Sequence, residues 1–139
     1  ELVVDALQRL QGDSASQLPD TGSLRGDLRA LLGHMSSNVT HDQVCMMRGM
    51  VSACGQDPEL ARVFHERMVE TKRAAALAVL ERGRERGEVA DGADLQLLVD
   101  VVPAMLVFRH LVTPYDVDDA YVDRAVDEVW LPLLTPQAP

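Results

Sequence analysis

The apolar residues of this chain recur at spacings of three and four, which is the period of an amphipathic α-helix. No segment shows the sustained alternation of apolar and polar residues that indicates a half-buried strand. Proline, glycine and capping residues divide the helical pattern into six predicted helices. They cover residues 1–11, 23–37, 41–53, 57–86, 94–112 and 118–133. We therefore predict an all-α fold, a multi-helix bundle of about six helices.

The fourth predicted helix has the clearest ends. Asp57 occupies the N-cap position and Pro58 the first helical position, where its missing N–H costs nothing. Gly87 supplies the residue that stops the helix. At about 1.5 Å per residue this helix is about 43 Å long, enough to run the full height of a small bundle.

The last two predicted helices have unusually broad apolar faces. Apolar residues go almost all the way round the helix over 94–112, so it must be covered on more than one side. The long fourth helix can cover only one side of the hairpin that the last two helices form. We expect a second copy of the chain to complete an intermolecular four-helix interface; the alternative is that earlier helices cover both faces. The predicted dimer-interface residues are Val122, Ala125, Val126, Val129, Trp130 and Leu133.

Composition limits the possible functions. A chain of 139 residues with 47% hydrophobic residues fits one globular domain. Its net charge is −9, and its densest basic stretch, at Arg82, Arg84 and Arg86, alternates with glutamates. We therefore expect the chain itself to bind DNA poorly. No run of uncharged apolar residues approaches the roughly 18 residues typical of a membrane span, and there is no secretory leader, which predicts a cytoplasmic protein.

The polar residues give no pattern typical of a metal site or of catalysis. His41 and Cys45 have metal-ligand spacing, but two ligands do not make a site. Cys45 and Cys54 lie nine residues apart, on opposite faces of one predicted helix, which excludes a disulfide between them. There is no phosphate-binding glycine loop, nucleophile elbow or di-iron motif. We predict no metal, no cofactor and no enzymatic activity. Lys72 is the one lysine among the 13 basic residues.

Several segments, taken in order, resemble a known family. They are Asp57-Pro58-Glu59-Leu60, Glu85-Arg86-Gly87-Glu88-Val89, Leu98-Val99-Asp100-Val101-Val102-Pro103, Phe108-Arg109-His110-Leu111-Val112-Thr113 and Asp119-Ala120-Tyr121-Val122-Asp123-Arg124. Together they resemble the C-terminal domain of TetR/AcrR-family transcription regulators, roughly over Leu24 to Leu134. The opening segment, Glu1 to Leu7, resembles the helix that follows the DNA-binding helix-turn-helix in such proteins.

The resemblance implies a homodimer whose two DNA-reading heads match a palindromic operator. It also implies that a small ligand enters a cavity among the middle helices and releases the DNA. On this basis residues 1–21 would be the end of a linking helix plus a connector, residues 22–135 an effector-binding and dimerisation domain, and 136–139 a tail. Operator DNA would be bound only through an N-terminal domain missing from this chain, and the regulator is expected to be a repressor. The alternative is a helical protein–protein interaction or scaffold domain without a small ligand.

The sequence also offers candidates for the wall of such a cavity. Methionine adapts to varied apolar ligands, so methionine and phenylalanine on the middle helices are the first choice, and the expected effector is small and apolar. The candidates are Met46, Met47, Met50, Phe64, Met68, Met105 and Phe108, with Arg48 as a cation for an anionic ligand. The alternatives are that the apolar residues are ordinary core and that Arg48 lies at the surface. The charge of −9 favours neutral or cationic effectors at long range, although a local arginine can reverse this.

Overall fold

The structure, a computed structural model, describes residues 2, 5, 18–36 and 39–136, and within them every regular element is a helix. The expected all-α fold is confirmed. The predicted helix over residues 1–11 lies almost entirely outside the described residues. The elements are α2 (Leu24–Ser36), α3 (His41–Cys54), α4 (Pro58–Phe64), η1 (His65–Val69), α5 (Glu70–Glu85), α6 (Leu95–Val112), α7 (Asp119–Arg124), η2 (Ala125–Trp130) and α8 (Leu131–Leu134).

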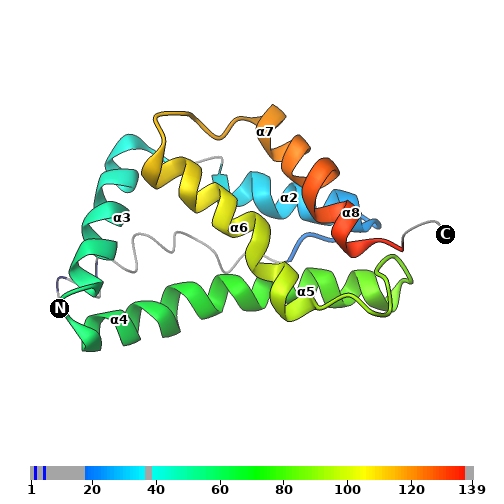
Figure 1. Cartoon of the computed structure of the whole chain (residues 1–139), viewed down its shortest axis with the longest axis horizontal. Coiled ribbons are helices and arrows are strands. Elements are labelled where there is room, and N and C mark those ends of the chain that lie inside the picture. Colours follow the sequence, from blue (N-terminus) through cyan, green and yellow to red (C-terminus); the bar gives the residue numbers. More distant parts are fainter. Residues whose placement is uncertain (1, 3–4, 6–17, 37–38, 137–139) are drawn as a thin grey trace.

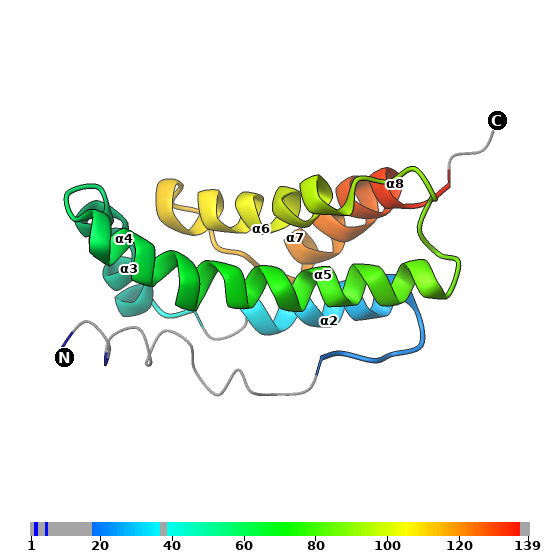
Figure 2. The same ribbon diagram turned by 90° about the horizontal axis from the view of Figure 1, so that it is seen from below.

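The helices form two layers that enclose one main core. Figure 2 shows α6, α7 and α8 in one layer above α5 and α2, with α3 and α4 at one end of the molecule. The main core lies between the layers, and its largest fully buried side chain is that of Trp130. The Trp130 indole N–H donates a hydrogen bond of 2.8 Å to the Leu98 carbonyl, which fixes the last helix against α6.

The predicted long helix forms one continuous rod through α4, η1 and α5 (Figure 1). The Asp57 carboxylate caps it by accepting from the backbone N–H groups of Glu59 and Leu60, at 3.1 and 3.2 Å. Gly87 ends it with a φ of 80°, a conformation that favours glycine. The sequence pattern did not predict the π-helical turn η1, in which the Glu70 N–H donates to the His65 carbonyl five residues earlier.

The last predicted helix also contains a π-helical turn. The turn η2 precedes α8, and the Leu131 N–H donates to the Val126 carbonyl. Pro132, which has no N–H to donate within a helix, follows this turn in α8.

The last helix turns most of its predicted dimer-interface residues inward. Val122, Ala125, Val126 and Trp130 are at most 2% exposed and belong to the core of their own chain. Leu133 is 51% exposed, and Val129 is half-buried. The expectation that all six residues face a partner therefore differs from the structure for these four, because α2 and α6 of the same chain already cover them.

A buried acid joins the start of α2 to the end of α5. The Asp27 carboxylate is fully buried and accepts from the Thr21 N–H at 2.6 Å and from the Thr21 hydroxyl at 2.9 Å. Arg86 and Arg82 donate to it at 2.8 and 3.3 Å. Burial alone would raise the Asp27 pKa, but the Thr21 and arginine hydrogen bonds outweigh this effect and hold the pKa below its usual range. Arg82 also donates to the Pro19 carbonyl, so the cluster holds the connector against the bundle.

Candidate functional site

A cavity of about 420 Å³ lies between α3, the η1–α5 rod and α6, with the end of α2 contributing to its wall. This volume falls in the range of small-molecule sites, roughly 300–1,000 Å³. The wall is predominantly apolar. Its residues are Met35, Val39, Val44, Met47, Val51, Phe64, Met68, Val69, Lys72, Arg73, Ala76, Val99, Asp100, Pro103, Ala104, Leu106, Val107, His110 and Leu111.

The π-helical turn η1 helps to align the long rod with the cavity. In a regular α-helix, each step of four residues moves a side chain about 40° around the axis. A π-helical turn takes up one extra residue and so reduces this drift. Phe64, Met68, Lys72 and Ala76 are spaced by four residues through η1 into α5, and all four line the cavity.

Helix α6 is apolar on nearly all sides because it has three different neighbourhoods. One sector is buried in the main core, and its residues are Leu95, Val99, Val102 and Leu106. A second sector carries most of the α6 residues on the cavity wall: Asp100, Pro103, Val107, His110 and Leu111. The third sector points outward and exposes its apolar side chains. We call this third sector the outer stripe, defined by Leu97, Phe108 and Val112, which are 62%, 58% and 68% exposed.

Two of the charged groups on the cavity wall neutralise each other. The Arg73 Nε donates to an Asp100 carboxylate oxygen at 3.1 Å. The other guanidinium nitrogens of Arg73 donate to the side chain and the backbone carbonyl of Gln96, at 3.0 and 2.7 Å. The wall gains no net charge from the Arg73–Asp100 pair.

His110 and Lys72 are the other titratable groups on the wall. The buried Nε2 of His110 has no hydrogen-bond partner within the described part of the chain. Burial lowers the His110 pKa, although Asp116 opposes the shift, so the ring is neutral at pH 7. Lys72 is an exposed residue at the edge of the cavity, and partial desolvation there lowers its pKa. No carboxylate among the described residues pairs with the Lys72 ammonium group, and a lysine remains charged at pH 7 after a modest shift.

Three of the eight predicted ligand-binding residues lie on the cavity wall: Met47, Phe64 and Met68. Met46 lies off the wall, on the neighbouring face of α3. Met50 is buried in a small second core, and Phe108 belongs to the outer stripe. Contact of any of these residues with an effector stays a prediction.

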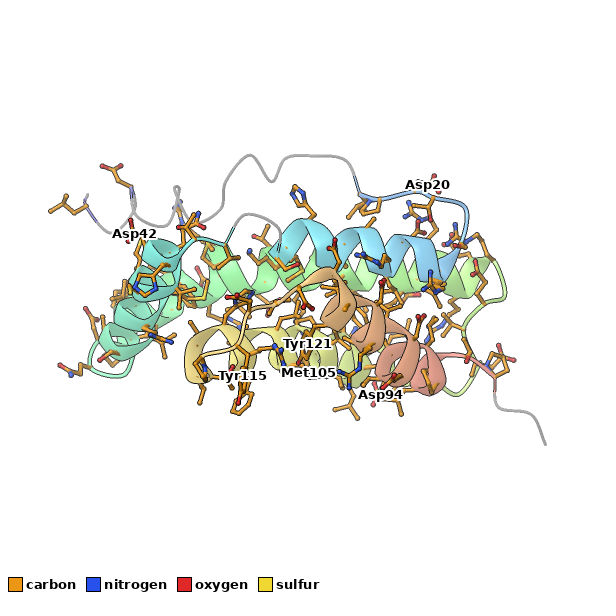
Figure 3. The ribbon with its side chains drawn as sticks, turned by 90° about the horizontal axis from the view of Figure 1, so that it is seen from above. Asp20, Asp42, Asp94, Met105, Tyr115 and Tyr121 are labelled. Atoms are coloured by element: carbon orange, nitrogen blue, oxygen red, sulfur yellow. The ribbon has the colours of Figure 1, made fainter. Side chains whose placement is uncertain are left out.

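The remaining two predicted residues make other contacts. Met105 packs against the main core, and Figure 3 shows it on the side of α6 nearer to Tyr121 of α7. Arg48 is not on the wall, because its Nε donates to the Leu111 carbonyl at 2.8 Å. The structure therefore gives Arg48 a structural contact with the end of α6 in place of the expected pocket position.

Sequence reasoning missed several residues of the wall. On α3 the helical period separates the face of Val44, Met47 and Val51 from the face of Met46 and Met50, and the cavity takes the first face. That pattern was visible, but nothing in the sequence says which face is covered. Nothing in the sequence around Lys72 and His110 indicated that they line a cavity, apart from the rarity of lysine in this chain.

In the part of the chain that the structure describes, no group of three or more His, Cys, Asp or Glu residues could hold a metal ion. The His41 Nε2 and the Cys45 Sγ approach to 3.5 Å on an exposed face of α3. Both cysteines are free.

Comparisons with known proteins agree on one family. Residues 18–129 match the family model described as the tetracyclin repressor-like C-terminal domain. The chain is 31% identical to the DNA-binding transcriptional repressor TetR of Mycobacteroides abscessus, over 99% of this chain and 72% of that protein. It is 27% identical to the HTH-type transcriptional regulator YdeS of Bacillus subtilis, over 76% of this chain and 53% of that protein. The chain thus spans about half the length of the Bacillus relative.

A solved structure has the same fold. The crystal structure of the TetR family transcription regulator SCO0332 superimposes with a TM-score of 0.76 and 27% sequence identity. The match covers 94% of this chain and 75% of that chain.

Proposed function

Because the chain belongs to the TetR family of transcriptional regulators, we propose that it is the effector-binding and homodimerising domain of a bacterial repressor. In this proposal residues 22–135 form the domain. Operator DNA is bound by an N-terminal helix-turn-helix of the whole regulator. The family is one of transcription regulators and not of enzymes.

The regulator works in the cytoplasm. Helix α6 is long and apolar enough to cross a membrane by length and composition alone. Its three sectors support another explanation, because core, cavity and outer stripe together account for its apolar residues. The TetR-family match supports the same explanation.

The cavity is the observation that carries the effector-binding role. Its wall combines adaptable methionines with branched aliphatic side chains, and the Arg73–Asp100 pair adds no net charge. A cavity of this size and lining suits a small, largely apolar molecule. A binder that prefers one arrangement of the helices then shifts the population of dimer geometries and with it the spacing of the DNA-binding heads.

The long rod provides a physical route for this shift. Its η1 and first α5 turns line the cavity through Met68 and Lys72, and at its C-terminal end Arg82 contacts Pro19 and Arg86 contacts Asp20 of the connector. The connector and the cavity-lining helix α3 lie toward opposite ends of the molecule, as the positions of Asp20 and Asp42 show in Figure 3. A ligand that displaces α5 would therefore act on the connector through a packed helix.

Filling the cavity should abolish ligand binding without unfolding the domain. We expect Met47→Trp to weaken by at least about tenfold the binding of any ligand that a thermal-shift screen of a chemically mixed library identifies. The unfolding free energy should change by less than about 1 kcal/mol, because the new ring occupies empty space. The matched control is Met46→Trp, on the same helix and also half-buried but off the wall.

Two outcomes would count against the effector-binding role. Equal affinity in the Met47→Trp protein would place the ligand outside the cavity. A library without any stabilising compound would favour the alternative, a helical protein–protein interaction domain with no small ligand. Such a domain needs no cavity of this kind.

The outer stripe supports the homodimer. Leu97, Phe108 and Val112 expose large apolar side chains on one face of α6, and Leu133 of α8 adds another in the same layer. Covering apolar surface of this kind with a second copy of the chain is energetically favourable. In a symmetric dimer the same patch on each chain forms both sides of the interface. The proposed interface is thus built from the outer stripe and Leu133 rather than from the buried residues of the last helix.

Charging the outer stripe should separate the dimer. We expect the double variant Leu97→Arg, Phe108→Arg to raise the dimer dissociation constant at least about 100-fold. In a symmetric interface the new arginines of one chain lie close to the same arginines of the second chain, and like charges repel. Sedimentation equilibrium at micromolar concentration measures this. The control is Ala30→Arg, on an exposed position of α2. A wild-type chain that is monomeric under these conditions would overturn the proposed dimer.

A further inference from the structure

The one lysine of the chain lies on the wall of the cavity. All 12 other Lys or Arg positions are arginines, and Lys72 alone among the 13 is a lysine. The sequence pattern gave no reason for this bias. Its position beside Met68, Val69 and Ala76 places a flexible, compact cation at the edge of a predominantly apolar space.

The charges on the cavity wall leave Lys72 without a balancing anion. Arg73 and Asp100 form an ion pair at 3.1 Å, and the pair is anchored further by Gln96. His110 contributes a neutral ring. Among the described residues no carboxylate contacts the Lys72 ammonium group, so the wall carries one uncompensated positive charge at neutral pH.

From this arrangement we propose that the effector is an amphipathic acid, whose apolar body fills the cavity and whose carboxylate or equivalent anionic group pairs with the Lys72 ammonium group. This inference rests on the proposed effector-binding function and specifies its ligand class. An anion at the wall gains a charge-assisted hydrogen bond in a partly desolvated setting, where such bonds are stronger than in water. The expectations from the sequence are revised in two respects. Lys72 takes the place of Arg48 as the pocket cation, and the local charge overrides the preference for cations that the net charge of −9 implied.

The buried Nε2 of His110 is consistent with a ligand that brings a polar atom into the cavity. This nitrogen has no hydrogen-bond partner among the described residues, and an unsatisfied buried polar atom is costly. A neutral imidazole can donate or accept through Nε2 according to its tautomer. The assignment of the acid to Lys72 does not depend on this second contact.

The proposal is tested with probes that share an apolar body and differ in charge. Octanoate is compared with octan-1-ol, and 2-naphthoate with 2-naphthamide, by isothermal titration at neutral pH. We expect the wild-type chain to bind the acid of at least one pair about tenfold more tightly than its neutral partner, as one charge-assisted hydrogen bond allows. In Lys72→Met this preference should fall to less than about threefold, with the affinity for the neutral probe unchanged. Lys72→Arg, which keeps the charge, should retain most of the preference.

Each result has a distinct meaning. Neutral probes that bind as tightly as the acids, with Lys72→Met unchanged, would leave the cavity as a ligand site but overturn the assignment of an acid. Acids preferred equally by the wild-type chain and Lys72→Met would place the anion elsewhere and also overturn it. If neither member of either pair binds, both the acid assignment and the proposed effector-binding function fail.

A second measurement avoids substitution altogether. Reductive methylation with ¹³C-formaldehyde labels the Lys72 amine and the chain's α-amino group while keeping their charge, and pH separates the two NMR signals. Addition of octanoate should shift the Lys72 signal and raise the Lys72 pKa, because a nearby anion favours the charged form. Octan-1-ol should do neither. An unmoved Lys72 signal at saturating octanoate would contradict the pairing even if the Lys72→Met protein did not fold.

Discussion

Replacing Val126 with aspartate is expected to unfold the chain rather than to separate a dimer. Val126 is 0% exposed and lies in the main core beside Trp130. A carboxylate there has no described cation beside it, and an uncompensated buried charge costs about 3–5 kcal/mol. Because a small domain has only about 5–15 kcal/mol of stability, most of the chain's stability would be lost.

The matched variant is Leu133→Asp in the next helical segment. Leu133 is 51% exposed, so its change should alter the unfolding free energy of the single chain by less than about 1 kcal/mol. It should instead weaken the dimer. Urea unfolding at a fixed protein concentration, together with sedimentation, separates the two effects. A folded, monomeric Val126→Asp protein would contradict the structure, because Val126 would then face a partner.

The second large effect is expected at Asp27. Replacing it with asparagine keeps the size of the side chain but removes the charge that Arg82 and Arg86 share. Removal of one partner of a buried ion pair costs about 3–5 kcal/mol, and we expect the lower end because both arginines keep some contact with solvent. The control is Asp20→Asn, which removes a 68% exposed carboxylate 3.8 Å from Arg86 and should cost less than about 1 kcal/mol.

The Asp27 pKa gives this prediction a pH dependence. Its value in the folded chain lies below the ordinary one, so the carboxylate contributes stability that is fully present above the unfolded value of about 3.9. That contribution is lost as the pH falls through the lower, folded value. The stability difference between the wild-type chain and Asp27→Asn should therefore be constant near neutral pH and shrink in strong acid. A difference that grows on acidification would show that the shift has the opposite sign.

Helix positions could be predicted from the sequence because their signals are local. Asp57, Pro58 and Gly87 mark the ends of the long rod through backbone chemistry that needs no knowledge of the rest of the chain. The π-helical turns were not predictable in the same way. An extra residue in a helix is stabilised by packing, such as the alignment of Phe64 and Met68 with the cavity, and leaves no mark in the apolar spacing.

What covers an apolar face could not be read from the sequence. The pattern around α6 correctly indicated several covered sides, but core, cavity wall and exposed stripe all require the same residue types. The apolar pattern predicted that Val126 and Trp130 contact a second copy of the chain. The same pattern arises when they pack inside their own chain, as the structure shows. Met46 and Met47 illustrate the same limit, because adjacent methionines on one helix differ only in what lies opposite them.

The charge of the cavity wall could not be predicted either, because it depends on which cations have partners that are distant in the sequence. The sequence indicated Arg48 as the pocket cation, with no such role for Arg73 or Lys72. The structure separates them, since the first donates to the Leu111 carbonyl, the second pairs with Asp100, and Lys72 alone faces the cavity without a carboxylate among the described residues. The partners of Arg73 and Arg48 lie 27 and 63 residues away along the chain, so no local spacing in the sequence could predict these contacts.

The most direct test of the central claim, that the cavity holds a small ligand, uses the six methionines of the chain. With ¹³C-labelled methyl groups, Met35, Met47 and Met68 report on the cavity wall, while Met46 and Met105 are internal controls. Met50 is not a control, because it packs in the same small core as Met68. We predict that octanoate, or octan-1-ol at higher concentration, shifts the three wall signals in a saturable way and leaves the signals of Met46 and Met105 nearly unchanged. Uniform small shifts, or shifts confined to the two controls, would contradict the account.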